Sequence, residues 1–429
     1  MTAPQGIRIM TSRERVHAAL DHREADRVPL DLSGSATTGM HVRSVYLLRQ
    51  ALGLDTPGTP IKVIEPYQML GEIGPDLMDA LGVDVVGLRG PRTMFGFENA
   101  DWKPWQLYDG TPVLVPAGFN IVPDAHGDIL MYPEGDASVP PSGRMPKDGF
   151  YFDAIVRQDP IDDDRLRVED NLEEFGPVTD GDLAWFRAEC DRVYGTGRAV
   201  LANFGGTAFG DIALVPAPWL KRPRGIRDIA EWYMSTAMRR DHIYAVFERQ
   251  CEIALANLEK IFAAVGNNVT AVFVTGTDFG SQQGPLIAPD AYRDLYKPFH
   301  TIVNDWVHTH TAWKTFIHSC GSVFAFLDDF VEAGFDILNP VQCSARDMDA
   351  QRLKDRYGDR VTFWGGGVDT QKTLPFGTPD DVENEVRDRI RIFGKGGGFV
   401  FNSVHNVQAS VPAENLVALY AAVKRYGRY

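Results

Sequence analysis

Residues 315–322 read Thr-Phe-Ile-His-Ser-Cys-Gly-Ser, a short apolar segment of β type that ends in polar residues and a glycine. Segments of the same kind recur along the second half of the chain, and stretches of helical patterning separate them. They occupy residues 199–204, 269–275, 336–339, 361–364 and 398–402. Strand and helix in this alternation predict a parallel sheet. We expect an α/β fold whose sheet closes into a barrel, with functional residues at the C-terminal ends of its strands.

The remaining elements fit a barrel with additions. Residues 225–236, 240–265 and 290–306 have helical patterns, and residues 83–88 predict a buried strand. Residues 11–22 predict a helix capped at Thr11 or Ser12, with Glu14 near the capping-box position. From about 109 to 153, frequent Pro, Gly and Asp with short alternating segments predict β-hairpins. A length of 429 residues suits one barrel domain over residues 1–429 with this insertion.

Composition narrows the class of protein. A net charge of -15 argues against a nucleic-acid partner, because phosphate binding needs clustered Lys and Arg. The four cysteines have no spacing typical of a secreted disulfide framework, and residues 1–10 lack the apolar core of a signal peptide. No apolar run approaches the roughly 20 residues of a membrane span. We expect a cytoplasmic protein with no membrane partner.

The pair His318 and Cys320 is the first candidate for chemistry. Residues i and i+2 of a strand share a face, so both side chains aim at one point, and imidazole with thiolate is a good zinc pair. The alternative is a buried histidine and a small core cysteine. His405 follows the last strand candidate and faces the same barrel mouth, where it would supply a third ligand and leave a fourth position open. Its alternative is a hydrogen-bonded loop histidine.

Other candidates surround this set. Asp278 follows a strand and suits a fourth ligand or a general base, with a helix cap as the alternative. The glycine run 365–367 lacks the Lys-Ser/Thr of a P-loop, so Gly366 and Gly367 are expected to leave room for a bulky substrate or cofactor. For several further residues we favour a structural role over a functional one: Glu65, Tyr67, Phe279, His308, His310, Cys343 and Asp369.

Several longer motifs resemble the uroporphyrinogen decarboxylase superfamily. They are Gly276-Thr277-Asp278-Phe279-Gly280, His318-Ser319-Cys320-Gly321-Ser322, Asp336-Ile337-Leu338-Asn339-Pro340-Val341-Gln342, Gly366-Gly367-Val368-Asp369-Thr370 and His405-Asn406-Val407-Gln408. Together they cover most of residues 270–427 in the family's order, whereas the N-terminal half matches loosely through Arg13-Glu14-Arg15 and Arg27-Val28-Pro29. The resemblance implies a TIM (β/α)8 barrel with an N-terminal helical extension and the β-hairpin insertion.

The superfamily contains two chemistries. Its decarboxylases carry an R-Q-A-G-R motif whose arginines grip porphyrin carboxylates, but residues 30–35 here read Leu-Asp-Leu-Ser-Gly-Ser, without arginine. Its cobalamin-dependent methyltransferases bind zinc through an H-x-C pair and a later Cys. This chain resembles them in His318 and Cys320 and departs from them in having His405 for the later Cys. An imidazole in place of a thiolate leaves zinc a stronger Lewis acid.

The resemblance therefore implies a zinc-dependent demethylase acting on a small O-, N- or S-methylated substrate. Zinc would be held by His318, Cys320 and His405, Asp278 would act as the catalytic group, and Gly366, Gly367 and Asp369 would line a cofactor position. A corrinoid (cobalamin) acceptor is expected on a partner protein, because Asp124-Ala125-His126 lacks the glycine of the D-x-H-x-x-G corrinoid motif. The family also makes a homodimer possible.

Two alternatives remain open at this point. One is a decarboxylase or lyase of a small acid, with Asp278 as the acid and no zinc. The other is a non-catalytic protein that binds a corrinoid or a tetrapyrrole. The methyl donor is not specified by the sequence, since specificity at a barrel mouth depends on loop shape.

Overall fold

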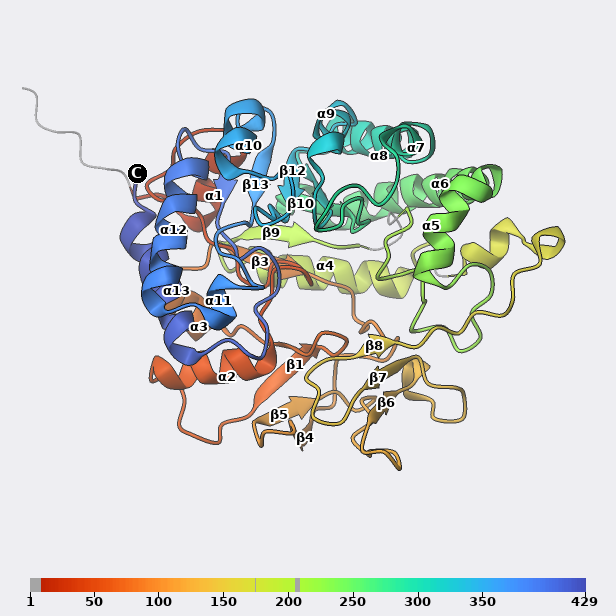
Figure 1. Ribbon diagram of the computed structural model, residues 1–429, viewed down its shortest axis with the longest axis horizontal. Helices are drawn as coiled ribbons and strands as arrows, with labels where there is room; N and C mark the ends of the chain where they lie inside the picture. The colour runs from red at the N-terminus through yellow and green to blue at the C-terminus, as the bar shows by residue number, and fades with distance from the viewer. Residues whose placement is uncertain (1–8, 174, 205–208) are drawn as a thin grey trace, which may run out of the picture.

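A seven-stranded parallel sheet forms the centre of the computed structural model, which describes residues 9–173, 175–204 and 209–429 (Figure 1). The strand order is β14-β13-β12-β11-β10-β9-β3, so neighbours in space follow one another along the chain. The strands are β3 (Val85–Leu88), β9 (Ala199–Ala202), β10 (Ala271–Thr275), β11 (Lys314–His318), β12 (Ile337–Asn339), β13 (Thr362–Trp364) and β14 (Phe399–Val400).

The segment around Leu30 occupies the eighth position and joins the two edges of this sheet. Leu30 pairs in parallel with Phe401, and Phe401 donates its N–H to the Pro29 carbonyl at 2.8 Å. On the other side, the Asp84 N–H donates to the Leu30 carbonyl at 2.7 Å, next to β3. Both edges are thereby paired, as in a TIM barrel. The predicted fold class is confirmed.

Helices surround the barrel (Figure 1). Helix α1 (Ser12–Leu20) has the predicted capping box between Thr11 and Glu14, and its Val16 packs with the barrel interior. The other helices are α2 (Val42–Ala51), α3 (Pro75–Leu81), α4 (Asp180–Tyr194), α5 (Ile229–Met238), α6 (Arg240–Val265), α7 (Pro289–Leu295), α8 (Lys297–His310), α9 (Leu327–Glu332), α10 (Ala350–Tyr357), α11 (Thr373–Phe376), α12 (Pro379–Phe393) and α13 (Ala413–Tyr426). Short 3-10 helices lie at Pro133–Gly135, Asp163–Arg165, Val168–Asn171, Gly266–Asn268 and Phe324–Phe326. In the described chain, no helix combines the length and apolar character needed to cross a bilayer.

The single helix expected over residues 290–306 is two helices, α7 and α8. Pro298 lies in the first turn of α8, where its missing N–H costs no hydrogen bond. The apolar pattern continues through this junction because both helices pack on the same side of the barrel. Helix α6 has the predicted bounds, whereas α5 begins four residues after the start of its predicted range and ends two residues beyond it.

The β-rich insertion lies beside the barrel, at the bottom of Figure 1. Its strands form two small sheets, β2-β1-β5-β4 and β6-β7-β8. Their bounds are β1 (Ile61–Glu65), β2 (Leu70–Gly71), β4 (Lys103–Gln106), β5 (Pro112–Val115), β6 (Ile129–Met131), β7 (Gly143–Met145) and β8 (Asp153–Ala154). Strand β1 pairs in parallel with β5, although β3 of the barrel separates them in sequence. The small sheet therefore recruits residues that precede the predicted insertion, a non-local pairing with no local sequence signal.

His300 of α8 lies in an aromatic cluster behind the barrel wall. Its imidazole is fully buried, it contacts the rings of Phe279 and Phe335, and its Nδ1 lies 3.1 Å from the Tyr292 hydroxyl. Burial alone lowers the pKa of His300 to about 3, against about 6.5 in an unfolded chain. The folded protein therefore holds this side chain neutral.

We expect His300→Gln to reduce the acid sensitivity of the fold. Once the pH falls below about 6.5, the unfolded chain binds a proton at His300 that the folded protein does not bind. The free energy of unfolding is therefore highest above pH of about 6.5 and decreases as pH falls toward 3. Between pH of about 7 and 5 the loss from His300 amounts to about 2 kcal/mol, which the variant should not show. Urea unfolding at both pH values measures it, with exposed His126→Gln as the control. Equal acid sensitivity of wild type and His300→Gln would contradict the prediction.

Candidate metal site at the barrel mouth

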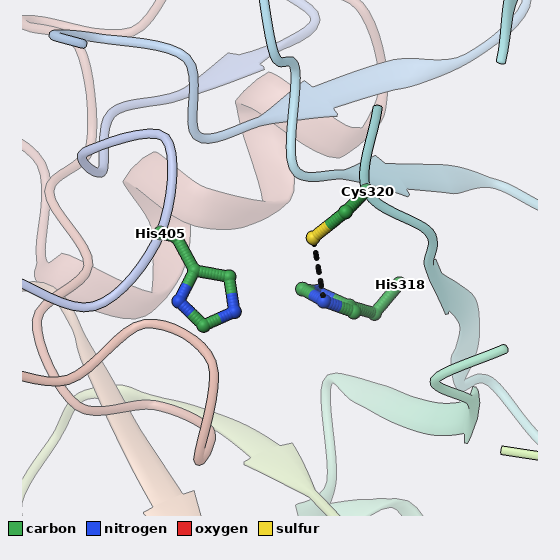
Figure 2. Close-up of side chains that lie close together, drawn as sticks. All are labelled: His318, Cys320 and His405. Atoms are coloured by element: carbon green, nitrogen blue, oxygen red, sulfur yellow. Dashed lines mark hydrogen bonds between the residues drawn. The ribbon is translucent and has the colours of Figure 1, made fainter. Parts of the chain in front are cut away.

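Three side chains predicted as zinc ligands converge at the C-terminal end of the barrel. His318 is the last residue of β11, Cys320 follows two residues later, and His405 lies on the loop after β14. Figure 2 shows the thiol and the two imidazole rings directed toward one another. Their ligand atoms all lie within 4.8 Å of one another, and Cys320 Sγ is 3.4 Å from His318 Nε2.

The chemistry of this donor set fits zinc. Tetrahedral Zn–S and Zn–N bonds of about 2.3 and 2.0 Å place sulfur and nitrogen about 3.5 Å apart, close to the observed separation. The surrounding protein lowers the pKa of His318 and of His405 to about 4, so both imidazoles are neutral near pH of about 7 with a lone pair available. Burial and the nearby Asp278 raise the pKa of the Cys320 thiol, so a metal ion must displace its proton.

Two glycines permit the backbone crossing that presents Cys320. Gly321 has a φ of 82°, and a Cβ there would lie 2.5 Å from the Gly280 carbonyl carbon. A Cβ on Gly280 would lie 2.6 Å from the Ser322 nitrogen. The loops after β10 and β11 thus pack backbone against backbone, which side chains at these positions would prevent.

Asp278 lies beside the three ligands. Its Oδ1 accepts a hydrogen bond from the Cys320 N–H at 2.6 Å, and its carbonyl accepts one from the Tyr233 hydroxyl at 2.6 Å. Burial raises the pKa of this carboxyl. Its negative charge acts on both Cys320 and His405. The position suits a group that orients a substrate or exchanges a proton, and the catalytic role remains a prediction.

Asp211 is a second buried carboxylate that sequence reasoning missed. Burial, followed by the repulsion of Asp278 among other effects, raises its pKa to about 6. Its carboxylate lies against Gly276, two residues before Asp278, and accepts a hydrogen bond from the Ala213 N–H at 2.9 Å. The residues before it have no strand pattern, so only the fold brings Asp211 to the mouth.

A cavity of about 270 Å³ opens beside the ligands. It is lined by Gly280, Ser281, Gln282, Cys320, Gly321, Gln342, Thr370, Gln371, Val404 and His405. Apart from Cys320, His405 and the apolar Val404, these described residues offer amides, hydroxyls and backbone, with neither a charged group nor an aromatic ring. The Gln342 amide oxygen accepts from the Gly321 N–H at 2.7 Å, which holds one wall in place.

The predicted cofactor-binding residues pack against the barrel instead of lining this cavity. A Cβ on Gly366 would lie 2.6 Å from the Val341 carbonyl oxygen, and one on Gly367 would overlap the Phe401 ring. Asp369 accepts hydrogen bonds from the Gln371 and Lys372 N–H groups at 2.7 and 2.8 Å. These contacts explain the glycines and the aspartate without a cofactor, and a cofactor role remains a prediction.

Most of the residues for which a structural role was favoured make contacts that explain such a role. Glu65 accepts hydrogen bonds from the Tyr67 and Gln68 N–H groups, and His308 lies 2.7 Å from Asp336. Phe279 is a core ring, and His310 stacks on Trp306. Cys343 is half-buried one strand beyond Cys320, and burial raises its pKa to about 11. It is not part of the three-residue cluster.

The second half of the chain matches a known family. The family model described as "Uroporphyrinogen decarboxylase (URO-D)" matches residues 218–426, which include all three candidate ligands.

Residues 218–426, a little under half of the chain, are therefore similar to the uroporphyrinogen decarboxylase family.

Individual relatives are distant. The uroporphyrinogen decarboxylase of Pseudoalteromonas atlantica is 33% identical over 79 residues, 18% of this chain and 21% of the relative. That of Pseudomonas putida is 24% identical over 330 residues, 75% of this chain and 80% of the relative. The first of these matches thus spans about a fifth of the relative's own length. A solved structure, a methyltransferase from Methanosarcina mazei, aligns with 97% of this chain and 99% of its own, at 17% identity and a TM-score of 0.53. This likeness shows that the chain shares the fold of that protein.

Proposed function

We propose that the protein is a zinc-dependent methyltransferase that moves a methyl group from a small O-, N- or S-methylated substrate to a corrinoid on a partner protein. The convergence of His318, Cys320 and His405 beside an open cavity is the observation that carries the proposal. The likeness in fold to a protein named as a methyltransferase over nearly the whole chain supports it.

His318, Cys320 and His405 would hold the zinc ion, and Cys320 and His405 also line the cavity. Zinc held there supplies Lewis-acid activation of the heteroatom that carries the methyl group. Asp278, whose carboxylate accepts the hydrogen bond of the Cys320 N–H, would orient the substrate and exchange a proton with the departing heteroatom. A reduced corrinoid on the partner would supply the nucleophile that accepts the methyl group, and the heteroatom would keep the bonding electron pair.

The cavity lining indicates the kind of methyl donor. Gln282, Gln342, Gln371, Ser281 and Thr370 provide neutral hydrogen-bonding groups. Carboxylates are commonly recognised by Arg or Lys, and quaternary ammonium groups by aromatic rings, and the described lining has neither. We therefore expect an uncharged methylated substrate, such as a methyl ether or thioether.

Decarboxylation of a porphyrin fits these surroundings less well. The substrate would carry several carboxylates into a cavity whose described lining has no cation. Arg89 lies next to the loop after Leu30, but its Nη2 already donates to Ser33 and Ser35.

The test is methyl transfer to cob(I)alamin. The zinc-loaded protein is mixed with cob(I)alamin and a panel of neutral, anionic and quaternary ammonium methyl donors, and methylcobalamin is followed by its absorption spectrum. Turnover with a neutral donor that is lost in His318→Ala supports the proposal. Release of CO2 from a carboxylated substrate, with no methylcobalamin from any donor, would favour the decarboxylase alternative.

A further inference from the structure

Asn339 lies beside His318 because of the register of the barrel. The two residues are partners in the parallel pairing of β11 and β12, so their side chains leave the sheet on the same face. Asn339 is fully buried, and its Oδ1 lies 2.6 Å from His318 Nδ1. The contact occurs on the ring edge opposite Nε2, the nitrogen that faces Cys320.

The amide of Asn339 has a defined orientation. Its Nδ2 donates to the Trp364 carbonyl at 2.7 Å, which only an amide N–H can do. Oδ1 must then be the atom that meets His318, and it also lies 3.4 Å from the Thr37 hydroxyl. Gly365 leaves the space for this arrangement, since a Cβ there would lie 3.2 Å from Asn339 Nδ2.

An acceptor at Nδ1 determines the tautomer of His318. A neutral imidazole carries one N–H, and the contact with Asn339 Oδ1 requires it on Nδ1. Nε2 then holds the lone pair, in agreement with its position 3.4 Å from Cys320 Sγ, whose S–H can donate to it. Imidazole ligands of metals usually have such a partner on the second nitrogen.

We infer that Asn339 is a positioning residue of the metal site, which holds His318 in the Nδ1–H tautomer with its Nε2 lone pair directed at the metal position. Its importance for zinc rests on the proposed function. The tautomer itself is a property of the protein without metal, so the two can be measured separately.

Three variants separate the acceptor from packing. Asn339→Leu keeps the branched shape and the number of side-chain heavy atoms and removes the acceptor, whereas Asn339→Asp keeps an oxygen beside His318. Asn304→Leu is the matched control, because Asn304 is equally buried and its Nδ2 likewise donates to one carbonyl, that of Ala333 at 2.8 Å. Asn304→Leu removes the same kind of hydrogen bond at a position outside the three candidate metal ligands.

The first readout is the long-range ¹H–¹⁵N spectrum of metal-free protein labelled with ¹⁵N-histidine, with the His318 signals identified by their absence in His318→Ala. We expect the Nδ1–H tautomer in wild type and in Asn304→Leu, and its loss in Asn339→Leu. The second readout is zinc affinity by competition with a chelator. We expect Asn339→Leu to bind zinc about 10- to 100-fold more weakly, the usual effect of losing such a partner, and Asn339→Asp to recover most of this loss.

Each outcome decides one of the two ideas. An Nε2–H tautomer in wild type, or unchanged tautomer and affinity in Asn339→Leu, overturns the inference. So does an Asn339→Asp variant as weak as Asn339→Leu, because packing and not the acceptor would then matter. A wild type that has the Nδ1–H tautomer but binds no zinc overturns the proposed function and leaves the orientation of His318 by Asn339 standing.

Discussion

Purified protein is expected to hold close to one zinc ion per chain, and the His318→Ala, His405→Ala and Cys320→Ser variants to bind it at least about 100-fold more weakly. A ligand supplies a direct bond to the metal, so its loss should exceed the effect of losing an outer partner of a ligand. Metal analysis after dialysis and chelator competition measure this. Activity with any methyl donor should fall together with the zinc content.

Neighbouring residues of the same type provide the controls. His310 is exposed on α8, and Cys343 is a half-buried thiol outside the cluster. We expect His310→Ala and Cys343→Ser to keep the zinc content of wild type. A wild type without metal would sink the zinc mechanism, and we would then test Asp278 in the lyase alternative. Loss of zinc in the Cys343→Ser variant would show that the metal site is not the cluster of His318, Cys320 and His405.

Asp84→Ala is expected to reduce the free energy of unfolding by about 3–5 kcal/mol, the cost of removing one partner from a buried ion pair. Asp84 is fully buried and accepts hydrogen bonds from Arg15 Nη1 at 2.6 Å and from Arg27 Nη1 at 2.7 Å. It also accepts one from the Leu30 N–H at 2.9 Å, where the barrel closes. The variant leaves Arg15, itself 5% exposed, without this partner.

The matched control is Asp328→Ala. Asp328 also pairs with two arginines, Arg356 and Arg360, but its side chain is 45% exposed. Such surface pairs contribute about 0–1 kcal/mol, so this variant should unfold within about 1 kcal/mol of wild type in urea. If Asp84→Ala costs no more than Asp328→Ala, the buried network does not hold the barrel closed.

The contacts of Asp84 also give a structural role to two arginine-containing motifs for which the sequence predicted none. Arg13-Glu14-Arg15 and Arg27-Val28-Pro29 carried the loose N-terminal resemblance to the superfamily, and the sequence predicted no role for their arginines. The structure shows that Arg15 of α1 and Arg27 before the Leu30 segment meet on one carboxylate. Residues far apart in the chain have no common periodicity, so the pairing could not be predicted.

The sequence by itself determined the features that depend on local periodicity. The strand pattern that runs up to His318 predicted that His318 and Cys320 aim at one point, and the repeated strand and helix patterns predicted the barrel and therefore His405 at the same mouth. The strand segments are short and strongly apolar, so their positions could be predicted from the sequence. The predicted catalytic and cofactor roles of Asp278, Gly366, Gly367 and Asp369 are not tested by the fold.

Tertiary structure alone decided the contacts made across strands and loops. The register of β11 against β12 sets Asn339 beside His318, and barrel closure brings Leu30 between Phe401 and Asp84. The packing of Gly366 and Gly367 against Val341 and Phe401 likewise depends on neighbouring strands. Each contact joins residues that lie far apart in the chain, and their distance in space is fixed by hydrogen-bond register and close packing, which leave no signal in the local pattern.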